Sequence, residues 1–291
     1  QKALYLALNW LNNTPLPHGS VDPKLQQRLF TVDDPGALIN RLDIPKASPS
    51  RTLCDMFWMT LPWAEITTEL GDIHMFDSGC GSGGYAESFQ QWSGDLVKRY
   101  VGFDIAEHPR WETLARQHPE FSFFAADSKQ IGAHIPPETN LLVSQSAIEH
   151  FQEDLTYFRQ VRDFVQAQQR PILQFHLLPS APTLRLYRFH GVRQFTPHTL
   201  SKITRLFSDF SDVTLYALGG KASNAVHYEY VTVPRVTRRG DDRETRTDAY
   251  VAAKTEAIIA DMQADTGEPS FYALIIPAFF PPAWRALPRA A

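Results

Sequence analysis

The stretch Ile73-His-Met-Phe-Asp77-Ser-Gly79-Cys-Gly81-Ser-Gly83-Gly84 decides the fold. A short apolar run ends at Asp77, and alternating glycines follow it directly. Because glycine has no Cβ atom, such a loop turns tightly and lets the backbone approach a ligand closely. The stretch is therefore typical of a buried strand followed by a ligand-binding loop.

Downstream of this loop, short apolar runs alternate with helical stretches. We expect strands at residues 73–77, 100–104, 121–125, 141–144 and 172–176, with helices that include 86–92 and 155–168. This alternation is typical of βαβ units and a parallel sheet. The predicted fold class is α/β, a Rossmann-like, doubly wound and mostly parallel sheet of seven strands.

The end of the sheet is expected to differ from its parallel centre. Strands are predicted at 213–218 and 226–233, and residues 219–224 between them are too few for a helical crossover, so the two should pair antiparallel. A helix at 199–207 precedes them, and a helix near 248–263 follows. The apolar run 271–280 could form an edge strand, a cap on the core or an oligomer contact, because Pro277 argues against a central strand.

Three segments are expected along the chain. Residues 1–71 form an N-terminal helical lead-in, because prolines break its apolar stretches into short pieces, and 50–70 pack on the sheet or act as a lid. Residues 72–234 form the core. Residues 235–291 form a C-terminal extension of a helix and an apolar segment.

Composition disfavours several classes of protein. The chain has 291 residues, of which 43% are hydrophobic and 21% charged, as in ordinary globular proteins. Its formal net charge of −4 disfavours a nucleic-acid partner. Two cysteines, Cys54 and Cys80, are too few for a disulfide framework, which fits a cytoplasmic location. Neither a signal peptide nor a membrane-spanning run is evident, so no membrane insertion is expected.

The glycine pattern alone is compatible with two cofactors. Gly79-x-Gly81-x-x-Gly84 also fits the dinucleotide fingerprint, with Asp104 after the next strand as ribose acceptor. Asp77, two places before the first glycine, favours a ligand with an ammonium group, because its carboxylate would repel a pyrophosphate. A nicotinamide cofactor is therefore the less favoured alternative.

The segment 73–233 resembles the class I S-adenosylmethionine-dependent methyltransferases, whose first motif is acidic-x-Gly-x-Gly-x-Gly. The resemblance implies S-adenosylmethionine as cofactor and S-adenosylhomocysteine as product. It assigns the ribose hydroxyls to Asp104 and the adenine amino group to Asp127, although either carboxylate could instead cap a helix. The residues expected at the cofactor are Asp77, Gly79, Cys80, Gly81, Gly83, Asp104, Ile105, Asp127, Ser128, Ser144, Gln145 and Ser146.

The segment after the fourth strand, 144–151, resembles one that ends in Glu-His in many small-molecule members of this family. Glu149 and His150 are therefore the first catalytic candidates. A histidine with an ordinary pKa near 6.5 can accept a proton from a hydroxyl at neutral pH, though His150 could also only hold the loops together. His176, at the end of the fifth predicted strand, is a third catalytic candidate or a histidine at the sheet edge that only makes structural hydrogen bonds.

The stretch 187–197 resembles the acceptor wall of the same family. Tyr187, His190 and Arg193 are the predicted substrate-binding residues; His190 or Arg193 could instead tie the loop down. No metal site is expected, because no set of carboxylate ligands is evident. The absence of an Asn/Asp-Pro-Pro-aromatic motif after the fourth strand disfavours amino groups and nucleic-acid bases as acceptors.

The sequence therefore predicts an enzyme, an S-adenosylmethionine-dependent O-methyltransferase. Its expected acceptor is a small polar molecule or a sugar unit, in surface polysaccharide or secondary-metabolite assembly. A homo-oligomer formed through the C-terminal segment is compatible with the apolar run there. The alternatives are a catalytically silent cofactor-binding module that acts through a protein partner, and an NAD(P)-dependent oxidoreductase.

Overall fold

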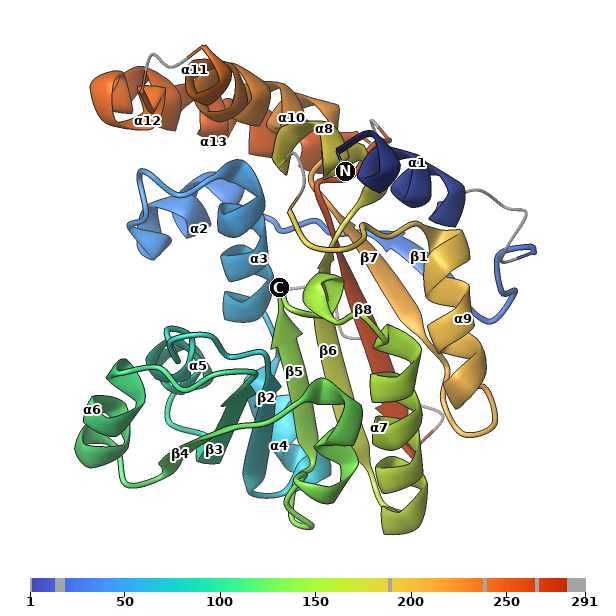
Figure 1. Ribbon diagram of the computed structural model, residues 1–291. Helices are drawn as coiled ribbons and strands as arrows, with labels where there is room; N and C mark the ends of the chain where they lie inside the picture. Colours follow the sequence, from blue (N-terminus) through green and yellow to red (C-terminus); the bar gives the residue numbers. More distant parts are fainter. Residues whose placement is uncertain (1, 14–18, 188–189, 238–239, 265–266, 282–291) are drawn as a thin grey trace.

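An eight-stranded sheet with helices on both faces forms the centre of the computed structural model, which describes residues 2–13, 19–187, 190–237, 240–264 and 267–281 (Figure 1). The strand order is β1-β7-β8-β6-β5-β2-β3-β4. All neighbours are parallel except β8, which is antiparallel to both β6 and β7. The strands are β1 (Gln26–Leu29), β2 (Ile73–Ser78), β3 (Val97–Asp104), β4 (Phe121–Ala125), β5 (Leu141–Gln145), β6 (Ile172–Pro179), β7 (Thr214–Leu218) and β8 (Phe271–Ala278).

The five predicted parallel strands, β2 to β6, are confirmed. β6 is buried at every position and β5 at all but its last, because helices cover both faces of the sheet. The strand order reverses between β2 and β5, and ligands of open α/β sheets bind at the carboxyl ends of strands at such a point. The Rossmann-like, doubly wound fold is confirmed, with eight strands instead of seven.

The predicted partner of β7 is wrong. Residues 226–233 are helical: they lie in α10 (Lys221–His227), a π-helical turn (Tyr228–Thr232) and α11 (Val233–Val236). The antiparallel neighbour of β7 is β8, from the apolar run near the C-terminus.

β8 is a central strand, so its interpretation as an edge strand, a cap or an oligomer contact is wrong as well. Its first five residues pair with β7 on one side and β6 on the other. Pro277 lies beyond Ile275, the last residue of β8 in regular register with β7. A residue without an N–H is tolerated there because one side of the strand has no regular ladder.

The N-terminal segment packs on the sheet. Its helices are α1 (Lys2–Asn12), α2 (Pro35–Leu42), α3 (Pro49–Met59) and α4 (Trp63–Leu70), as expected of a helical lead-in. Leu53, Trp58 and Ile66 are fully buried in the apolar cluster that also includes residues of the sheet. The segment also supplies β1, which the sequence did not predict. With β1 and β8 in place, the sheet extends beyond residues 72–234 on both sides.

The remaining helices are α5 (Ala86–Ser93), α6 (Arg110–Gln117), α7 (Asp154–Gln168), α8 (Leu184–Tyr187), α9 (Pro197–Phe207), α12 (Asp242–Thr245) and α13 (Thr247–Gln263). One apolar cluster joins α3, α4, α5 and α13 to the sheet, and another joins α7 and α9 to its other face.

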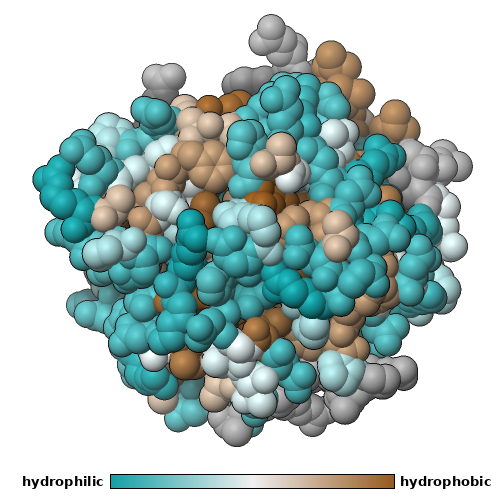
Figure 2. Space-filling view, turned by 90° about the horizontal axis from the view of Figure 1, so that it is seen from below, coloured by the Kyte–Doolittle hydropathy of each residue, from teal (hydrophilic) through white to brown (hydrophobic). Residues whose placement is uncertain are grey.

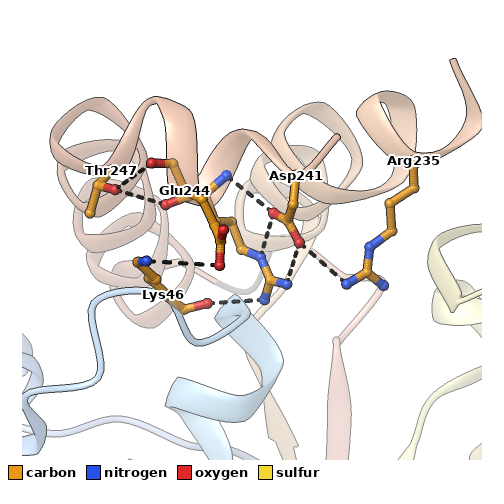
Figure 3. Close-up of polar contacts among 6 residues, drawn as sticks. Lys46, Arg235, Asp241, Glu244 and Thr247 are labelled. Carbon is orange, nitrogen blue, oxygen red and sulfur yellow. Dashed lines mark hydrogen bonds and ion pairs between the residues drawn. The ribbon is translucent and has the colours of Figure 1, made fainter. Parts of the chain in front are cut away.

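Helices α10 to α13, between β7 and β8, form a layer above the carboxyl ends of the parallel strands (Figure 1). Buried Lys254 donates hydrogen bonds to the carbonyls of Ile44 and Pro45, both at 3.1 Å. Figure 3 shows a second set of contacts, in which Asp241 accepts from Arg235 and Lys46 pairs with Glu244. The layer is therefore fixed to the loop before α3.

The opposite face, at the amino ends of the parallel strands, is largely hydrophilic, with small apolar areas (Figure 2). Among the helices that the structure describes, none is both long and apolar enough to cross a membrane.

Candidate functional site

The glycine loop lies at the carboxyl end of β2. Gly79, Gly81 and Gly83 have φ angles of 76°, 55° and 74°, in the left-handed region that favours glycine. A Cβ atom on Gly79 would lie 2.4 Å from that of Ala147, and one on Gly83 would lie 2.8 Å from Cδ1 of Leu114. A Cβ atom on Gly81 would meet nothing within 4 Å. Two of the glycines thus permit close packing, while Gly81 borders open space.

Asp104 ends β3 and turns its carboxylate back onto this loop. Oδ2 accepts a hydrogen bond from the N–H of Gly81 at 2.8 Å, and Oδ1 accepts one from Ile105 at 2.7 Å. A carboxylate offers about four acceptor positions, so these two bonds leave capacity for the hydroxyls of a ligand. The side chain is only partly buried and can reach such a ligand.

The backbone N–H groups of the loop are engaged within the protein. Gly79 and Cys80 both donate to the carbonyl of Phe103 at 2.9 Å, and Gly81 donates to Asp104. A dinucleotide fold offers such N–H groups to a pyrophosphate. Here a diphosphate would meet engaged donors and a carboxylate, so the geometry disfavours a nicotinamide cofactor.

A cavity of about 570 Å³ opens at this edge of the sheet. Its volume lies in the usual range of small-molecule sites. It brings together seven of the predicted cofactor residues: Gly79, Gly81, Asp104, Ile105, Asp127, Ser128 and Ser146. The other lining residues are Phe103, Ala126, Lys129, Ala147, His150, Phe151 and Gln152.

Ile105, which follows β3, and Asp127, which follows β4, both line the cavity. Ile105 is 78% exposed, and an aromatic ring placed on it would remove this apolar surface from water. Asp127 accepts a hydrogen bond from the N–H of Lys129 at 2.9 Å and so caps the short helix Ser128–Ala133. It both caps a helix and lines the cavity, so the two interpretations of this residue are compatible.

The other predicted cofactor residues do not line this cavity. Asp77 is buried below the loop, where Oδ2 accepts from the hydroxyl of Tyr100 at 2.5 Å and burial raises the pKa of the carboxyl to about 7. Cys80 packs below the loop, where its Sγ fills the space beside Gly102, and burial raises the pKa of its thiol. Gly83 faces Leu114 and not the cavity.

His176 is a residue of the core, so its predicted catalytic role does not fit the structure. It is fully buried, its Nδ1 lies 2.8 Å from Oγ of Ser144, and burial lowers its pKa to about 3. β6 runs three residues beyond it, to Pro179. Ser144, which is also fully buried, therefore binds the histidine ring in place of the expected cofactor.

A carboxylate and two imidazoles lie together beside the cavity. The rings of His150 and His190 are 4.7 Å apart and nearly perpendicular. Glu149 is fully buried, accepts a hydrogen bond from Oγ of Ser146, and has its pKa raised to about 7 by burial. Ser146 holds this position with a φ of 50°, which is uncommon for a residue other than glycine and marks backbone strain at a functional site.

A second cavity, of about 230 Å³, adjoins this cluster. Ser146 lines both cavities, His150 lines the first, and His190 lines the second. Besides Ser146, three predicted residues line the second cavity: Gln145, Tyr187 and His190. The other lining residues, which the sequence did not indicate, are Ser48, Ser50, Arg51, Cys54, Tyr85, Pro179 and Phe271.

Arg51 is the main residue missed by sequence reasoning. Its Nε donates to both oxygens of buried Asp55, at 2.8 and 2.9 Å, and its guanidinium lies 4.2 Å from the ring centre of Tyr85. The side chain is 49% exposed, and its terminal nitrogens make no further hydrogen bond in the described part of the chain. No local sequence pattern indicates Arg51, because it lies in the N-terminal helices, far in sequence from the glycine loop. Tyr85 directly follows that loop, so its position could have indicated it.

Arg193 holds its own loop in place instead of facing a substrate. It forms an ion pair with Asp154 at 2.7 Å and donates to the carbonyl of Gln152 at 2.7 Å. The side chain is only 15% exposed. Tyr187 does line the second cavity, where its hydroxyl bonds to Ser50. Residues 188 and 189 of the predicted acceptor wall lie outside the described residues.

A larger groove, of about 1140 Å³, lies elsewhere, among α1, α8 and α10. Leu6, Arg185 and Tyr228 are among its lining residues, and none of the predicted site residues is. Its size is therefore not an argument for the site, which we assign from the residues around the glycine loop.

No family model matches the sequence, and no curated protein matches it either. Among solved structures it is similar to the N-methyltransferase NodS from Bradyrhizobium japonicum WM9 with bound S-adenosylhomocysteine, at 15% identity and a TM-score of 0.45 over 84% of this chain and 92% of NodS.

Two further structures are similar to a comparable degree. The plantazolicin methyltransferase BpumL, with a desmethyl analogue and S-adenosylhomocysteine, is 11% identical at a TM-score of 0.44 over 96% of this chain and 99% of its own. Phosphoethanolamine N-methyltransferase 2 from Haemonchus contortus, with S-adenosylmethionine, is 13% identical at 0.43, over 83% of this chain and 59% of its own. Similarity this low does not assign an activity, so function has to be argued from the site.

Proposed function

We propose that this chain is an S-adenosylmethionine-dependent methyltransferase that acts on a small molecule. The observation that carries the proposal is Asp104, whose carboxylate is held on the glycine loop by two backbone N–H groups at the edge of a 570 Å³ cavity. A carboxylate in this place suits a pair of ribose hydroxyls, and the engaged N–H groups of Gly79, Cys80 and Gly81 disfavour a pyrophosphate. The open space beside Gly81 gives a ligand room to lie against the loop.

Other residues of the first cavity fit the same cofactor. Ile105 provides an apolar surface for the adenine ring, and Asp127 provides an acceptor for its amino group. Ser146 lines the first cavity and the second, so the amino-acid part of the cofactor would extend past it. Arg51 offers a guanidinium to a carboxylate at that end, either that of the cofactor or that of an anionic acceptor.

The acceptor, in this proposal, enters the second cavity and presents an oxygen. The cofactor supplies an electrophilic methyl group, and the protein must align the acceptor with it and remove the proton of the hydroxyl. The cluster Glu149–His150–His190 lies between the cavities, in the position this task requires. A small polar molecule or a sugar unit suits a cavity of about 230 Å³ with serine, arginine and tyrosine side chains.

Turnover tests the proposal. The purified chain, incubated with S-adenosylmethionine carrying a labelled methyl group, should transfer label to small polar components of cell-envelope or metabolite extracts and release S-adenosylhomocysteine. Cofactor that binds but is never turned over, with any extract, would favour the catalytically silent module. Binding of reduced nicotinamide, seen as a change in its fluorescence, would favour the oxidoreductase.

A further inference from the structure

Three side chains between the two cavities are placed like the ligands of a metal ion. Nε2 of His150 and Nε2 of His190 each lie 4.0 Å from Oε1 of Glu149, too far for a hydrogen bond. The candidate ligand atoms of the three residues lie within 4.8 Å of one another. We propose that Glu149, His150 and His190 bind a divalent transition-metal ion.

The electrostatics of the cluster favour a cation. Glu149 is fully buried, and its Oε2 has no hydrogen-bond partner among the described residues. A buried carboxylate without a compensating partner is costly, and a cation would compensate it. The imidazoles of His150 and His190 face this carboxylate, and imidazole is the commonest metal ligand among protein side chains.

Only a small movement would complete the coordination. Metal–ligand bonds of about 2.0–2.2 Å place neighbouring ligand atoms roughly 3.0–3.5 Å apart. The two separations of 4.0 Å from Glu149 therefore have to close by about 0.5–1.0 Å, and the ligand atoms of the two imidazoles, which lie within 4.8 Å of each other, by at most about 1.8 Å. Both imidazoles can make this adjustment, because their side chains are 46% and 49% exposed, while the buried carboxylate stays in place.

The loop that carries His190 is held against Glu149. The N–H of Val192 donates to the carbonyl of Glu149 at 2.8 Å, and Gly191, with a φ of 69°, packs on the Glu149 side chain. Tyr5 of α1 and Gln194 donate to the carbonyl of His190 at 3.0 and 2.9 Å. The third ligand is thus fixed beside the other two by the fold, which is the condition for a metal site built from distant segments.

The donor set indicates the class of ion. Two imidazoles and one carboxylate suit the divalent ions from manganese to zinc, whereas magnesium and calcium prefer oxygen ligands. The sequence predicts no metal site, because no set of carboxylate ligands is evident in it. The proposed site differs from that expectation because two of its three ligands are histidines.

The free coordination positions of the metal ion indicate which class of acceptor would bind; this inference rests on the proposed function. Three protein ligands leave at least one position free, where a hydroxyl oxygen would bind and release its proton to solvent water more readily. An acceptor with a second oxygen next to the hydroxyl, such as a sugar diol, could occupy two positions. The cation would then take over from an imidazole the task of making the hydroxyl reactive.

Calorimetric titration of the metal-free chain, without cofactor, tests the site with MnCl₂, CoCl₂ and MgCl₂ as probes. We expect one Mn²⁺ or Co²⁺ per chain, bound more tightly than Mg²⁺. The absorption spectrum of the Co²⁺-loaded chain should show a band in the visible range. Glu149→Gln and His190→Ala should each weaken binding by at least about 100-fold, the upper end of what changes beyond the direct ligands cost. His134→Ala, at an exposed histidine outside the cluster, is the matched control and should bind like the wild type.

Failure of the metal site and failure of the proposed function are separate results. No stoichiometric binding by the folded wild-type chain, or binding that both variants leave unchanged, would overturn the metal site. Because the titration contains no cofactor, a chain that binds metal but not S-adenosylmethionine would overturn the proposed function alone. The His190 side chain is half-exposed, so His190→Ala should fold. This variant therefore tests the metal site even if Glu149→Gln does not fold.

Discussion

Two carboxylates at the glycine loop have opposite environments. Asp104 is partly exposed, bonds to two backbone N–H groups and borders the cavity. Asp77 is buried beneath the loop, with the hydroxyl of Tyr100 as its partner, and burial raises its pKa to about 7. One motif thus supplies an acceptor for a ligand and a support for the loop.

The raised pKa of Asp77 makes stability depend on pH. The folded chain retains a proton on this group up to about pH 7, whereas the unfolded chain releases it near its ordinary pKa of about 3.9. The stabilisation from the bound proton is therefore lost as the pH rises through about 7. The Tm of Asp77→Asn, which cannot ionise, should therefore rise relative to that of the wild type between about pH 5 and about pH 8. Equal Tm differences at both pH values would contradict the buried, protonated state of Asp77.

His150→Ala should lower the rate of methyl transfer by about 10²–10⁴-fold, whether the ring accepts a proton or holds a metal ion, while cofactor affinity changes little. Because burial lowers the pKa of this imidazole, its neutral form persists below the usual 6.5. The wild-type rate should therefore rise with pH and level off by about pH 6.5. Steady-state rates across pH provide the measurement. Near-normal turnover by a stable variant would remove His150 from catalysis.

At the scale of elements, the loop between β2 and α5 allows a matched pair of substitutions. An alanine Cβ at position 83 would meet Leu114 and Phe123 at 2.8 Å, whereas one at position 81 would meet nothing within 4 Å. Both sites have positive φ, so each change costs roughly 1–3 kcal/mol of backbone strain. Gly83→Ala should lose additional stability to the clash, and Gly81→Ala should weaken cofactor binding more than its stability loss explains.

Denaturant unfolding and calorimetry with S-adenosylmethionine check this pair. If Gly81→Ala is the more destabilised variant and its cofactor affinity is unchanged, then Gly81 packs within the protein and does not face the cofactor, which contradicts this account.

The sequence predicted the elements of the sheet better than their order. Strands β2 to β6 stand out because each is a short apolar run between helical stretches. Residues 226–233 have aromatic and β-branched residues typical of a strand, yet they are helical, and the ring of Tyr230 packs on that of Tyr250 in α13. Tertiary contacts here override weak local preferences. The position of β8 between β6 and β7 depends on contacts distant in sequence, which no local pattern contains.

At the scale of the whole molecule, the two halves of the site differ in how far the sequence predicts them. The proposed cofactor half lies on loops that directly follow β2, β3, β4 and β5, so motifs along the chain indicate it. The acceptor half combines α3, the loop near His190 and the start of β8. His176 was misassigned because the sequence does not show that β6 continues to Pro179, which leaves the ring inside the sheet.

Calorimetric titration of the full chain with S-adenosylmethionine and with NAD, in the wild type and in Asp104→Ala, tests the central claim most directly. We expect one S-adenosylmethionine per chain and no heat with NAD. Asp104→Ala should lose about 1.5–3 kcal/mol of binding, the scale of hydrogen bonds to a charged group, which is roughly a 10- to 150-fold higher Kd. Asp163→Ala, at a side chain 74% exposed on α7, is the control and should bind like the wild type. Unchanged affinity in folded Asp104→Ala, or binding of NAD in preference to S-adenosylmethionine, would contradict the assignment of the site.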